Sequence, residues 1–326
     1  MALANARSTD AMAPVLDKLA SMISNRDLRT DLAPAVAGQA RVFCCHKATL
    51  SGLFPPNSLL AVEDCVEHRV PRLEIDVRFL ADDRMLVFHD GSLDSETTGS
   101  GRVDALMAVA VRDLRFRADE SVPLSFLEDV VDVLRQGESL LQVDLKLRRP
   151  ISAVRLDALA GVLQPIRDRV LVGSQAHWNL RGLPARGIPV AIDPTLQWQY
   201  APSRESERAL PFRRGLHGLW DDAPIAHVRG VSFTDYCGVR IADIVGLLPE
   251  AREWMVDIAT IRQFSALGVH LGNELGRRGI ELAAWTMVDE GPGPSSEVLK
   301  SLFSAGVTTV ITDAATKLAG YAASLS

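Results

Sequence analysis

The most informative segment of the chain is an apolar run that carries two acids, Arg72-Leu73-Glu74-Ile75-Asp76-Val77. Residues two apart on a strand point to the same side, so Glu74 and Asp76 direct two carboxylates into one volume. Two anions on a largely buried strand are unfavourable unless a positive charge lies between them. A hard divalent cation with oxygen ligands meets this need. For an isolated pair of acids, the alternative is an ion pair with Arg72 or Arg78 at the rim.

Two further segments repeat this design of an apolar run that ends in polar groups. Residues 140–146 (LLQVDLK) place Asp144 and Lys146 on one face, and residues 42–47 (VFCCHK) end in His46 and a lysine. The active sites of α/β barrels lie at the C-terminal ends of the strands. The three segments therefore indicate one functional site rather than unrelated surface charges.

Short β-rich runs alternate with helical stretches along the chain, which is typical of a parallel sheet with crossover helices. Eight such units predict an α/β protein with a single (β/α)₈ TIM barrel, an N-terminal helix and loop insertions. The strands are expected at residues 41–45, 72–77, 140–146, 170–174, 188–193, 229–234, 281–287 and 308–312.

A ninth apolar run, residues 85–89, follows the second strand too closely for a parallel crossover. We expect it to belong to a hairpin excursion over the mouth of the barrel. This placement brings His89 toward Glu74 and Asp76.

Composition narrows the class of protein. A chain of 326 residues with 47% hydrophobic content can bury one large core or two smaller ones. A net charge of −6 and a pI near 5.7 argue against a nucleic-acid partner, and leave a small-molecule substrate as the expected partner. The four cysteines fit neither a disulfide framework nor a zinc motif, so a reducing, cytoplasmic location is expected.

The N-terminal region is expected to be a helical extension. Apolar residues recur at helical spacing over residues 12–23, which predicts an amphipathic helix packed on the main domain. Asp10 and Asp17 argue against a membrane anchor, and we expect no integral membrane contact. The predicted organisation is therefore a helical extension at residues 1–40 and a barrel domain at residues 41–326.

Two segments interrupt the alternating pattern. Residues 91–102 form a polar stretch punctuated by glycine, and residues 194–228 carry prolines and aromatic residues amid scattered charge. Long loops in compact domains are commonly lids or binding loops. We expect residues 194–228 to shape the choice of substrate.

The motifs, in their order along the chain, resemble the signature of glycerophosphodiester phosphodiesterases. The similarity covers residues 41–315, is strongest over residues 72–103 and is weak over residues 195–260. The motifs are His46-Lys47, Pro55-Pro56-Asn57-Ser58, Glu74-Ile75-Asp76-Val77, Phe88-His89-Asp90, Leu93-Asp94, Thr97-Thr98-Gly99-Ser100-Gly101-Arg102-Val103, Val122-Pro123-Leu124, Leu127-Glu128-Asp129-Val130, Asp144-Leu145-Lys146, Ala284-Trp285-Thr286 and Ile311-Thr312-Asp313. The resemblance implies a metal-dependent barrel that acts on phosphodiesters.

The resemblance also implies a role for each residue of the site. Glu74, Asp76 and Asp144 would hold one divalent cation, Mg²⁺ or Ca²⁺, to neutralise the phosphoryl oxygens. His46 and His89 would serve as general base and general acid, with the assignment between them open. The residues expected to contact phosphate or substrate are Lys47, Lys146, Trp285 and Asn57.

Three of these contact residues have an alternative role. Lys146 would instead hold a metal-ligating carboxylate, and Trp285 would be part of the core. Asn57 would cap the helix that begins near Ser58.

The chain departs from the family pattern at several positions. It has His46-Lys47-Ala48 where His-Arg-Gly is usual, and lysine offers phosphate a point charge instead of a two-pronged fork. Asp144 stands where the third metal-binding strand usually carries glutamate, and Pro56 where an acid is common. The Asp-x-Lys pair is similar to sphingomyelinase D-type phospholipases, which share the barrel and favour internal phosphoryl transfer.

Three functions follow as hypotheses. The first is hydrolysis of a small phosphodiester, either a glycerophosphodiester or a sugar phosphodiester of the opine (agrocinopine) type, with a cyclic phosphate as one route. The second is phosphoryl transfer on the same barrel, by a phospholipase D-like, cyclic phosphate-releasing or sugar-phosphodiester-forming reaction. The third is a non-catalytic barrel that binds phosphorylated ligands.

Overall fold

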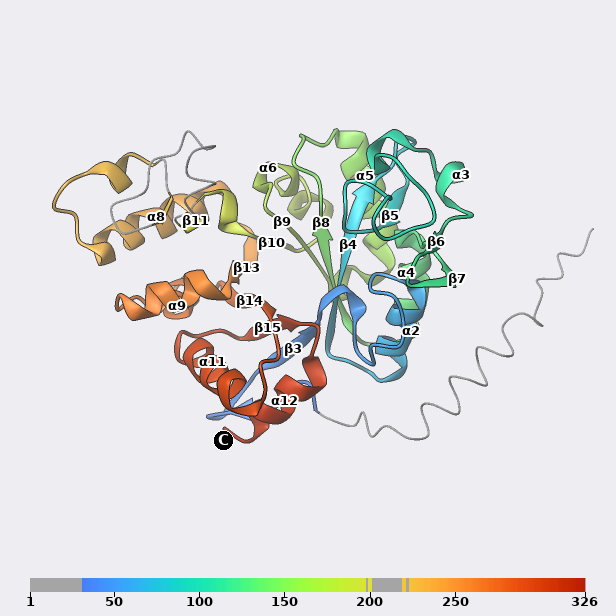
Figure 1. Ribbon diagram of the computed structural model, residues 1–326. Helices are drawn as coiled ribbons and strands as arrows, with labels where there is room; N and C mark the ends of the chain where they lie inside the picture. The colour runs from blue at the N-terminus through green and yellow to red at the C-terminus, as the bar shows by residue number, and fades with distance from the viewer. Residues whose placement is uncertain (1–30, 198, 201–218, 221–222, 326) are drawn as a thin grey trace, which may run out of the picture. The chain divides into compact units, whose positions relative to one another are not determined.

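Eight parallel strands form a closed barrel in the computed structural model, which describes residues 31–197, 199–200, 219–220 and 223–325 (Figure 1). Each strand pairs in parallel with the next along the chain, and the last pairs with the first, which closes the ring. The predicted (β/α)₈ architecture is confirmed. The strands are β3 (Val42–Cys45), β4 (Arg72–Phe79), β8 (Leu140–Leu145), β9 (Val170–Ser174), β10 (Val190–Ile192), β13 (Ala251–Asp257), β14 (Glu281–Met287) and β15 (Thr309–Thr312).

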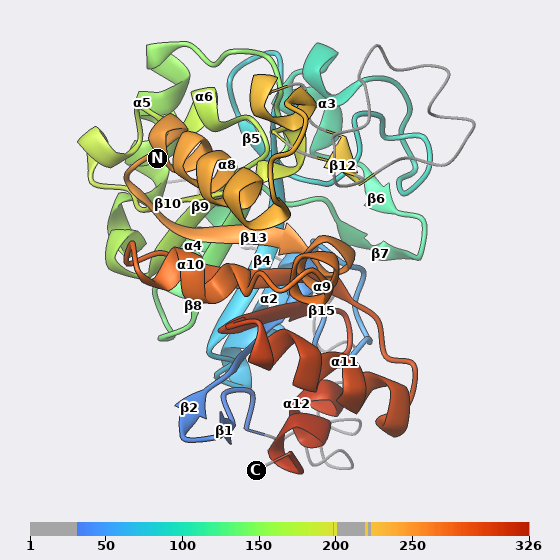
Figure 2. The ribbon, with the colours of Figure 1, turned by 90° about the vertical axis from the view of Figure 1, so that its left-hand side faces the viewer.

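The helices pack outside the ring of strands (Figures 1 and 2). Most of the apolar core lies between the barrel and these helices, and a second, small cluster fills the barrel interior. Cys45 belongs to the first and Cys44 to the second, as expected for neighbours on one strand. The helices are α2 (Leu59–Glu67), α4 (Leu127–Leu134), α5 (Ala153–Leu163), α6 (His177–Leu180), α8 (Phe233–Leu247), α9 (Ile258–Ala266), α10 (Leu271–Gly276), α11 (Pro292–Ser304) and α12 (Ala315–Ala323).

The prediction of the sixth strand was wrong. Residues 229–234 lead into α8, whose first turn is capped by the Ser232 hydroxyl accepting a hydrogen bond from the Asp235 main-chain nitrogen. The sixth strand is β13, about twenty residues further on. Its sequence, AREWMVD, carries the charged residues Arg252 and Glu253 near its start, which is not typical of a buried strand. Glu253 is nevertheless buried, because its ion-pair partner, Arg72, lies on a distant strand.

The predicted hairpin is confirmed. Strand β5 (Met85–Val87) runs antiparallel to β4 and opens an excursion that contains α3 (Ala108–Val111), β6 (Arg115–Phe116) and β7 (Asp119–Pro123). The excursion has its own small core, which includes Phe88 before His89 and Leu93 after it. This core fixes the chain on either side of His89.

Short antiparallel pairs join β1 (Ala35–Val36) to β2 (Gln39–Ala40), and β11 (Gln199–Tyr200) to β12 (Leu219–Trp220). The predicted helix at residues 12–23 and much of the predicted 194–228 insertion lie outside the described residues. None of the helices in the described ranges combines the length and apolar character that a membrane span requires.

A buried ion pair crosses the barrel interior between β4 and β13. Both guanidinium Nη atoms of Arg72 donate to the Glu253 carboxylate, at 2.8 and 2.6 Å. Arg72 also donates to Gln142 Oε1 on β8. Arg72 is the first residue of β4 and Glu253 the third of β13, so the pair lies toward the N-terminal end of the barrel. The active sites of such barrels lie at the opposite end, so we assign this ion pair a role in stability.

Replacing Glu253 by glutamine is expected to lower the free energy of unfolding by about 3–5 kcal/mol, because Arg72 would keep a buried charge without its partner. Equilibrium unfolding in urea measures the change. The matched control is Asp132→Asn, which removes an exposed ion pair with Arg135 and is expected to change little. Equal effects of the two substitutions would contradict the assignment.

Candidate active site

Three carboxylates meet on the adjacent strands β4 and β8, beyond the level of the barrel at which β3 ends. Asp76 and Asp144 are directly opposite each other in the parallel register, and Glu74 lies two residues earlier on the same face as Asp76. One oxygen from each carboxylate lies within 4.8 Å of the other two. Glu74 and Asp76 are buried, and Asp144 is partly exposed. An all-oxygen cluster of this kind matches the ligands that Mg²⁺ and Ca²⁺ prefer.

The three carboxylates are close together and largely buried, so a nearby positive charge would stabilise their ionised forms. Burial, reinforced by the neighbouring Asp76 and Asp144 carboxylates, raises the pKa of Glu74 well above its usual range. Burial also raises the pKa of Asp144. Burial acts on Asp76 in the same direction, but the Lys146 charge and a hydrogen bond from Asn57 outweigh it and lower the pKa of Asp76.

Lys146 supplies part of this charge. Its Nζ lies 2.6 Å from Asp144 Oδ2 and 3.1 Å from Asp76 Oδ1. Burial would lower the pKa of Lys146, but the two carboxylates outweigh it and raise the pKa, so the side chain is an ammonium. Even so, Asp76 Oδ1 is buried and accepts no well-formed hydrogen bond from the described residues. Asp76 Oδ1 therefore keeps acceptor capacity beyond its ion pair with Lys146, which fits a metal ligand.

The arginines considered as ion-pair partners of the acids act elsewhere. Arg72 is bound to Glu253, and Arg78 donates to the main-chain oxygens of His89 and Lys146, at 2.7 and 2.9 Å. Arg78 thereby ties together the two segments that carry site residues.

Asn57 lies behind the carboxylates. Its Nδ2 donates to Asp76 Oδ2 at 2.8 Å, and its Oδ1 accepts from the Asp76 main-chain nitrogen at 3.0 Å. The side chain is buried and does not line the cavity described below. Ser58 caps α2 in its place. These contacts favour a role in orienting Asp76 over direct contact with substrate.

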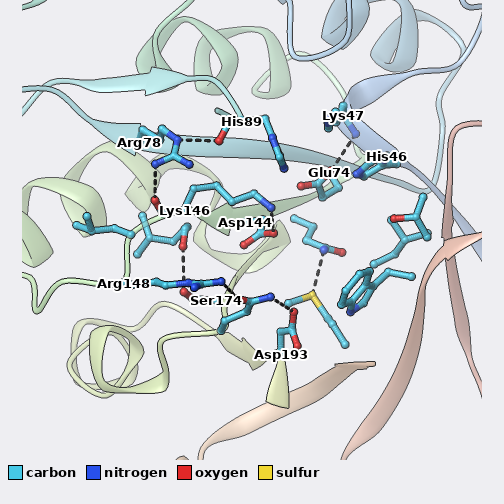
Figure 3. A pocket seen from close by; sticks show the side chains of 18 of the residues that line it. His46, Lys47, Glu74, Arg78, His89, Asp144, Lys146, Arg148, Ser174 and Asp193 are labelled. Carbon is cyan, nitrogen blue, oxygen red and sulfur yellow. Dashed lines mark hydrogen bonds and ion pairs between the residues drawn. The ribbon is translucent and has the colours of Figure 1, made fainter. Parts of the chain in front are cut away.

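Two histidines face the carboxylates from different elements (Figure 3). His46 begins a short turn after β3, where its Nδ1 lies 2.8 Å from Asp313 Oδ1 and its Nε2 lies 4.0 Å from Glu74 Oε2. His89 follows β5, and its Nδ1 lies 2.7 Å from Asp90 Oδ1. In both cases an aspartate engages Nδ1, so Nε2 is the ring nitrogen that this hydrogen bond leaves available.

Asp90 and Asp313 were not among the predicted site residues. The hydrogen bond from each histidine lowers the pKa of its aspartate, which therefore stays ionised. Both acids stood inside motifs that were noted for the resemblance. Asp90 adjoins His89 in sequence, whereas the pairing of Asp313 with His46 requires closure of the barrel between β15 and β3.

Replacing Asp313 by asparagine is expected to lower turnover about 10- to 100-fold, because an amide can present either a donor or an acceptor to Nδ1 of His46, whereas the carboxylate only accepts and so orients the ring. Nitrogen-15 NMR of the imidazole separates this role from a general loss of structure. The Nδ1–H tautomer of His46 should give way to a mixture, while His89 keeps its signals. Unchanged His46 signals would contradict the role.

A cavity of about 660 Å³ opens above these groups. Seven of the nine predicted site residues line it: His46, Lys47, Glu74, His89, Asp144, Lys146 and Trp285. Trp285 also packs on the small cluster inside the barrel, so it has both of the roles considered for it. The cavity wall further includes Arg78, which was considered only as an ion-pair partner of the acids, and Arg148, Gln175 and Asp193, which sequence reasoning did not single out.

Residues 48–186 match the model of the glycerophosphoryl diester phosphodiesterase family. The matched region is less than half of the chain, and within it the motif residues make the chain similar to this family. A Bacillus subtilis protein, "Uncharacterized protein YqiK", is 31% identical over 144 residues, 40% of this chain and 56% of that protein. Glycerophosphodiester phosphodiesterase 1 of Rattus norvegicus is 29% identical over 83 residues, 26% of this chain and 25% of that protein. The matches thus span about half of the first relative and a quarter of the second.

Two solved structures share the fold. Glycerophosphodiester phosphodiesterase from Agrobacterium tumefaciens aligns with a TM-score of 0.57 at 14% identity, covering 85% of this chain and 98% of that one. A phosphodiesterase from Oleispira antarctica, in complex with the product sn-glycerol-3-phosphate, aligns with a TM-score of 0.56 at 17% identity, covering 86% and 95%. At these identities, the likeness establishes the barrel alone.

Proposed function

We propose that the protein is a metal-dependent phosphodiesterase that cleaves a small phosphodiester, of the glycerophosphodiester class or a sugar phosphodiester of the opine type. One observation carries this proposal. Three carboxylate oxygens lie within 4.8 Å of one another in a cavity that two histidines also line. The similarity of residues 48–186 to the glycerophosphoryl diester phosphodiesterase family and the barrel fold support it.

Glu74, Asp76 and Asp144 would hold the metal ion, for which Mg²⁺ and Ca²⁺ are the candidates. When bound, the ion would neutralise the phosphoryl oxygens, whose negative charge otherwise repels a nucleophile. The fit rests on the all-oxygen ligand set and on Asp76 Oδ1, a buried oxygen that pairs with the Lys146 ammonium but accepts no well-formed hydrogen bond from the described residues. Lys47 and Lys146 would add positive charge beside the phosphate.

His46 and His89 would move the protons. One Nε2 takes the proton of the attacking hydroxyl, and the other gives a proton to the leaving alkoxide oxygen. Asp313 and Asp90, which lie 2.8 and 2.7 Å from the two Nδ1 atoms, would accept a hydrogen bond from each and so orient the rings. The attacking hydroxyl belongs either to water or to the substrate itself, and attack by the substrate forms a cyclic phosphate.

Phosphorus-31 NMR of the Mg²⁺-loaded protein tests the function. The probes are glycerophosphoglycerol, glycerophosphocholine and an opine-type sugar phosphodiester. Hydrolysis yields a phosphate monoester. A persistent cyclic phosphate or a new diester would instead indicate phosphoryl transfer. Binding of a diester without turnover of any probe would contradict an enzymatic function and favour a non-catalytic barrel.

A further inference from the structure

Four large apolar side chains are exposed beside the mouth of the cavity. Met107 and Val109 lie at the start of α3, Val154 in the first turn of α5 and Trp178 on α6. Val109 and Val154 are 76% and 70% exposed, and the other two are also exposed. Figures 1 and 2 both show α3, α5 and α6 along one edge of the molecule. We call these four side chains the rim patch.

Hydrogen bonds join the elements that carry the rim patch into one surface. The indole Nε1 of Trp178 donates to the main-chain oxygen of Arg148 at 3.1 Å, which holds α6 against the segment that leads to α5. In the first turn of α5, Arg155 donates to Asp83 Oδ1 at 2.7 Å. The adjacent Asp82 accepts from the first main-chain nitrogen of α3 at 2.8 Å. The four apolar side chains therefore lie along one connected rim.

Two arginines add positive charge to this rim. Arg148 and Arg149 are exposed and line the cavity. Arg148 donates to the neutral amide oxygen of Gln175, and neither arginine forms an ion pair with a carboxylate in the part of the chain that the structure describes. The acids on the neighbouring segments, Asp83 and Asp104, are each paired with another arginine. The rim is thus locally positive, although the net charge of the chain is −6.

This combination suits the surface of an anionic lipid bilayer. Apolar side chains bind at the boundary between headgroups and acyl chains, where tryptophan is enriched. Arginines beside them attract anionic headgroups. None of the four side chains of the rim patch lines the active-site cavity, so they project outward instead of enclosing a ligand. A bilayer is soft and needs no matching groove, so it fits such a rim better than a folded protein partner does.

We propose that the rim patch, together with Arg148 and Arg149, docks the protein on the surface of an anionic lipid bilayer. The apolar side chains lie at the headgroup boundary, and the two arginines lie against the anionic headgroups. The contact is peripheral and needs no membrane-spanning helix. It goes beyond the proposed function and does not depend on which reaction the site catalyses.

Vesicle flotation of the whole chain tests the docking surface. The probes are vesicles of phosphatidylcholine alone and mixed vesicles of phosphatidylcholine and phosphatidylglycerol. We expect the wild-type protein to bind the mixed vesicles at least 10-fold more tightly, and to lose this binding at high salt. The double substitution Val109→Glu and Val154→Glu should weaken binding at least 10-fold, because it replaces two apolar contacts by charges of the same sign as the lipid. Arg149→Gln should weaken binding about 5-fold.

The matched control is Leu267→Glu, the same kind of change at an exposed apolar position at the C-terminal end of α9. This variant should bind the mixed vesicles as wild type does. Fluorescence gives a second measurement. Mixed vesicles should shift the tryptophan emission to the blue, and Trp178→Phe should remove that shift, because the indole of Trp178 is the one that enters the interface.

Arg149→Gln decides the question if the double variant does not fold. Failure of the wild-type protein to bind mixed vesicles would overturn the proposal. So would equal binding by wild type and the variants of the rim, or equal loss of binding in Leu267→Glu. A dimer that sedimentation velocity detects without vesicles, and that the double substitution dissociates, would assign the rim patch to a second copy of the chain instead. Turnover enters none of these measurements, so its absence would overturn only the proposed function.

Discussion

Replacing either His46 or His89 by alanine is expected to lower the rate of phosphodiester cleavage by about 10²–10⁴-fold, the usual contribution of one general acid or base. The two side chains are 21% and 39% exposed and line the cavity, so neither supports the core. The melting temperature should therefore stay close to that of wild type. Steady-state kinetics with a glycerophosphodiester, together with thermal unfolding, measure both effects.

His270→Ala is the matched control. His270 is exposed at the start of α10, does not line the cavity and should be replaceable without loss of activity. Removing both catalytic imidazoles at once should cost less than the product of the two single losses, because base and acid act in one reaction. Turnover at the wild-type rate by either single variant would refute the acid–base assignment.

Replacing Glu74 by glutamine is expected to abolish metal-dependent activity while stabilising the metal-free protein. Burial and two neighbouring carboxylates disfavour the Glu74 anion, and an amide of similar shape removes that repulsion. The same change removes a ligand charge from the metal site. In wild type, Mg²⁺ at 100 times its Kd should add about 2.7 kcal/mol of stability. In the variant, this gain should largely disappear.

Thermal unfolding with and without Mg²⁺ separates the two effects of Glu74→Gln. Treatment of the wild-type protein with a chelator should likewise abolish activity, and added Mg²⁺ or Ca²⁺ should restore it. Activity that survives thorough removal of divalent cations would exclude the metal role. So would a variant that is stabilised by Mg²⁺ as much as wild type.

The parts of the fold that could be predicted are those in which local sequence carries the signal. Strand β4 and the carboxylates on it follow from the alternation of apolar and acidic residues over six positions. The hairpin at β5 follows from a loop too short for a crossover. In contrast, β13 depends on a buried Glu253, and nothing near it in sequence shows that Arg72 neutralises it.

The same distinction holds for the site. Glu74, Asp76 and Asp144 are recognisable because each pair of acids, or acid and lysine, has the two-residue spacing of one strand face. The pairing of Asp313 with His46 joins residues 267 positions apart in sequence. A chain of hydrogen bonds from Arg148 to Asp193 joins the ends of three strands. Such contacts form only when the barrel closes, so no local pattern in the sequence predicts them.

Diffraction from a crystal soaked in Mn²⁺ and inorganic phosphate tests the central claim most directly, because Mn²⁺ replaces Mg²⁺ and has an anomalous signal. We predict one anomalous peak between Glu74, Asp76 and Asp144, within about 2.0–2.6 Å of an oxygen of each. The phosphate should lie between His46 and His89. A peak elsewhere, or none at full Mn²⁺ loading, would contradict the assignment of these carboxylates.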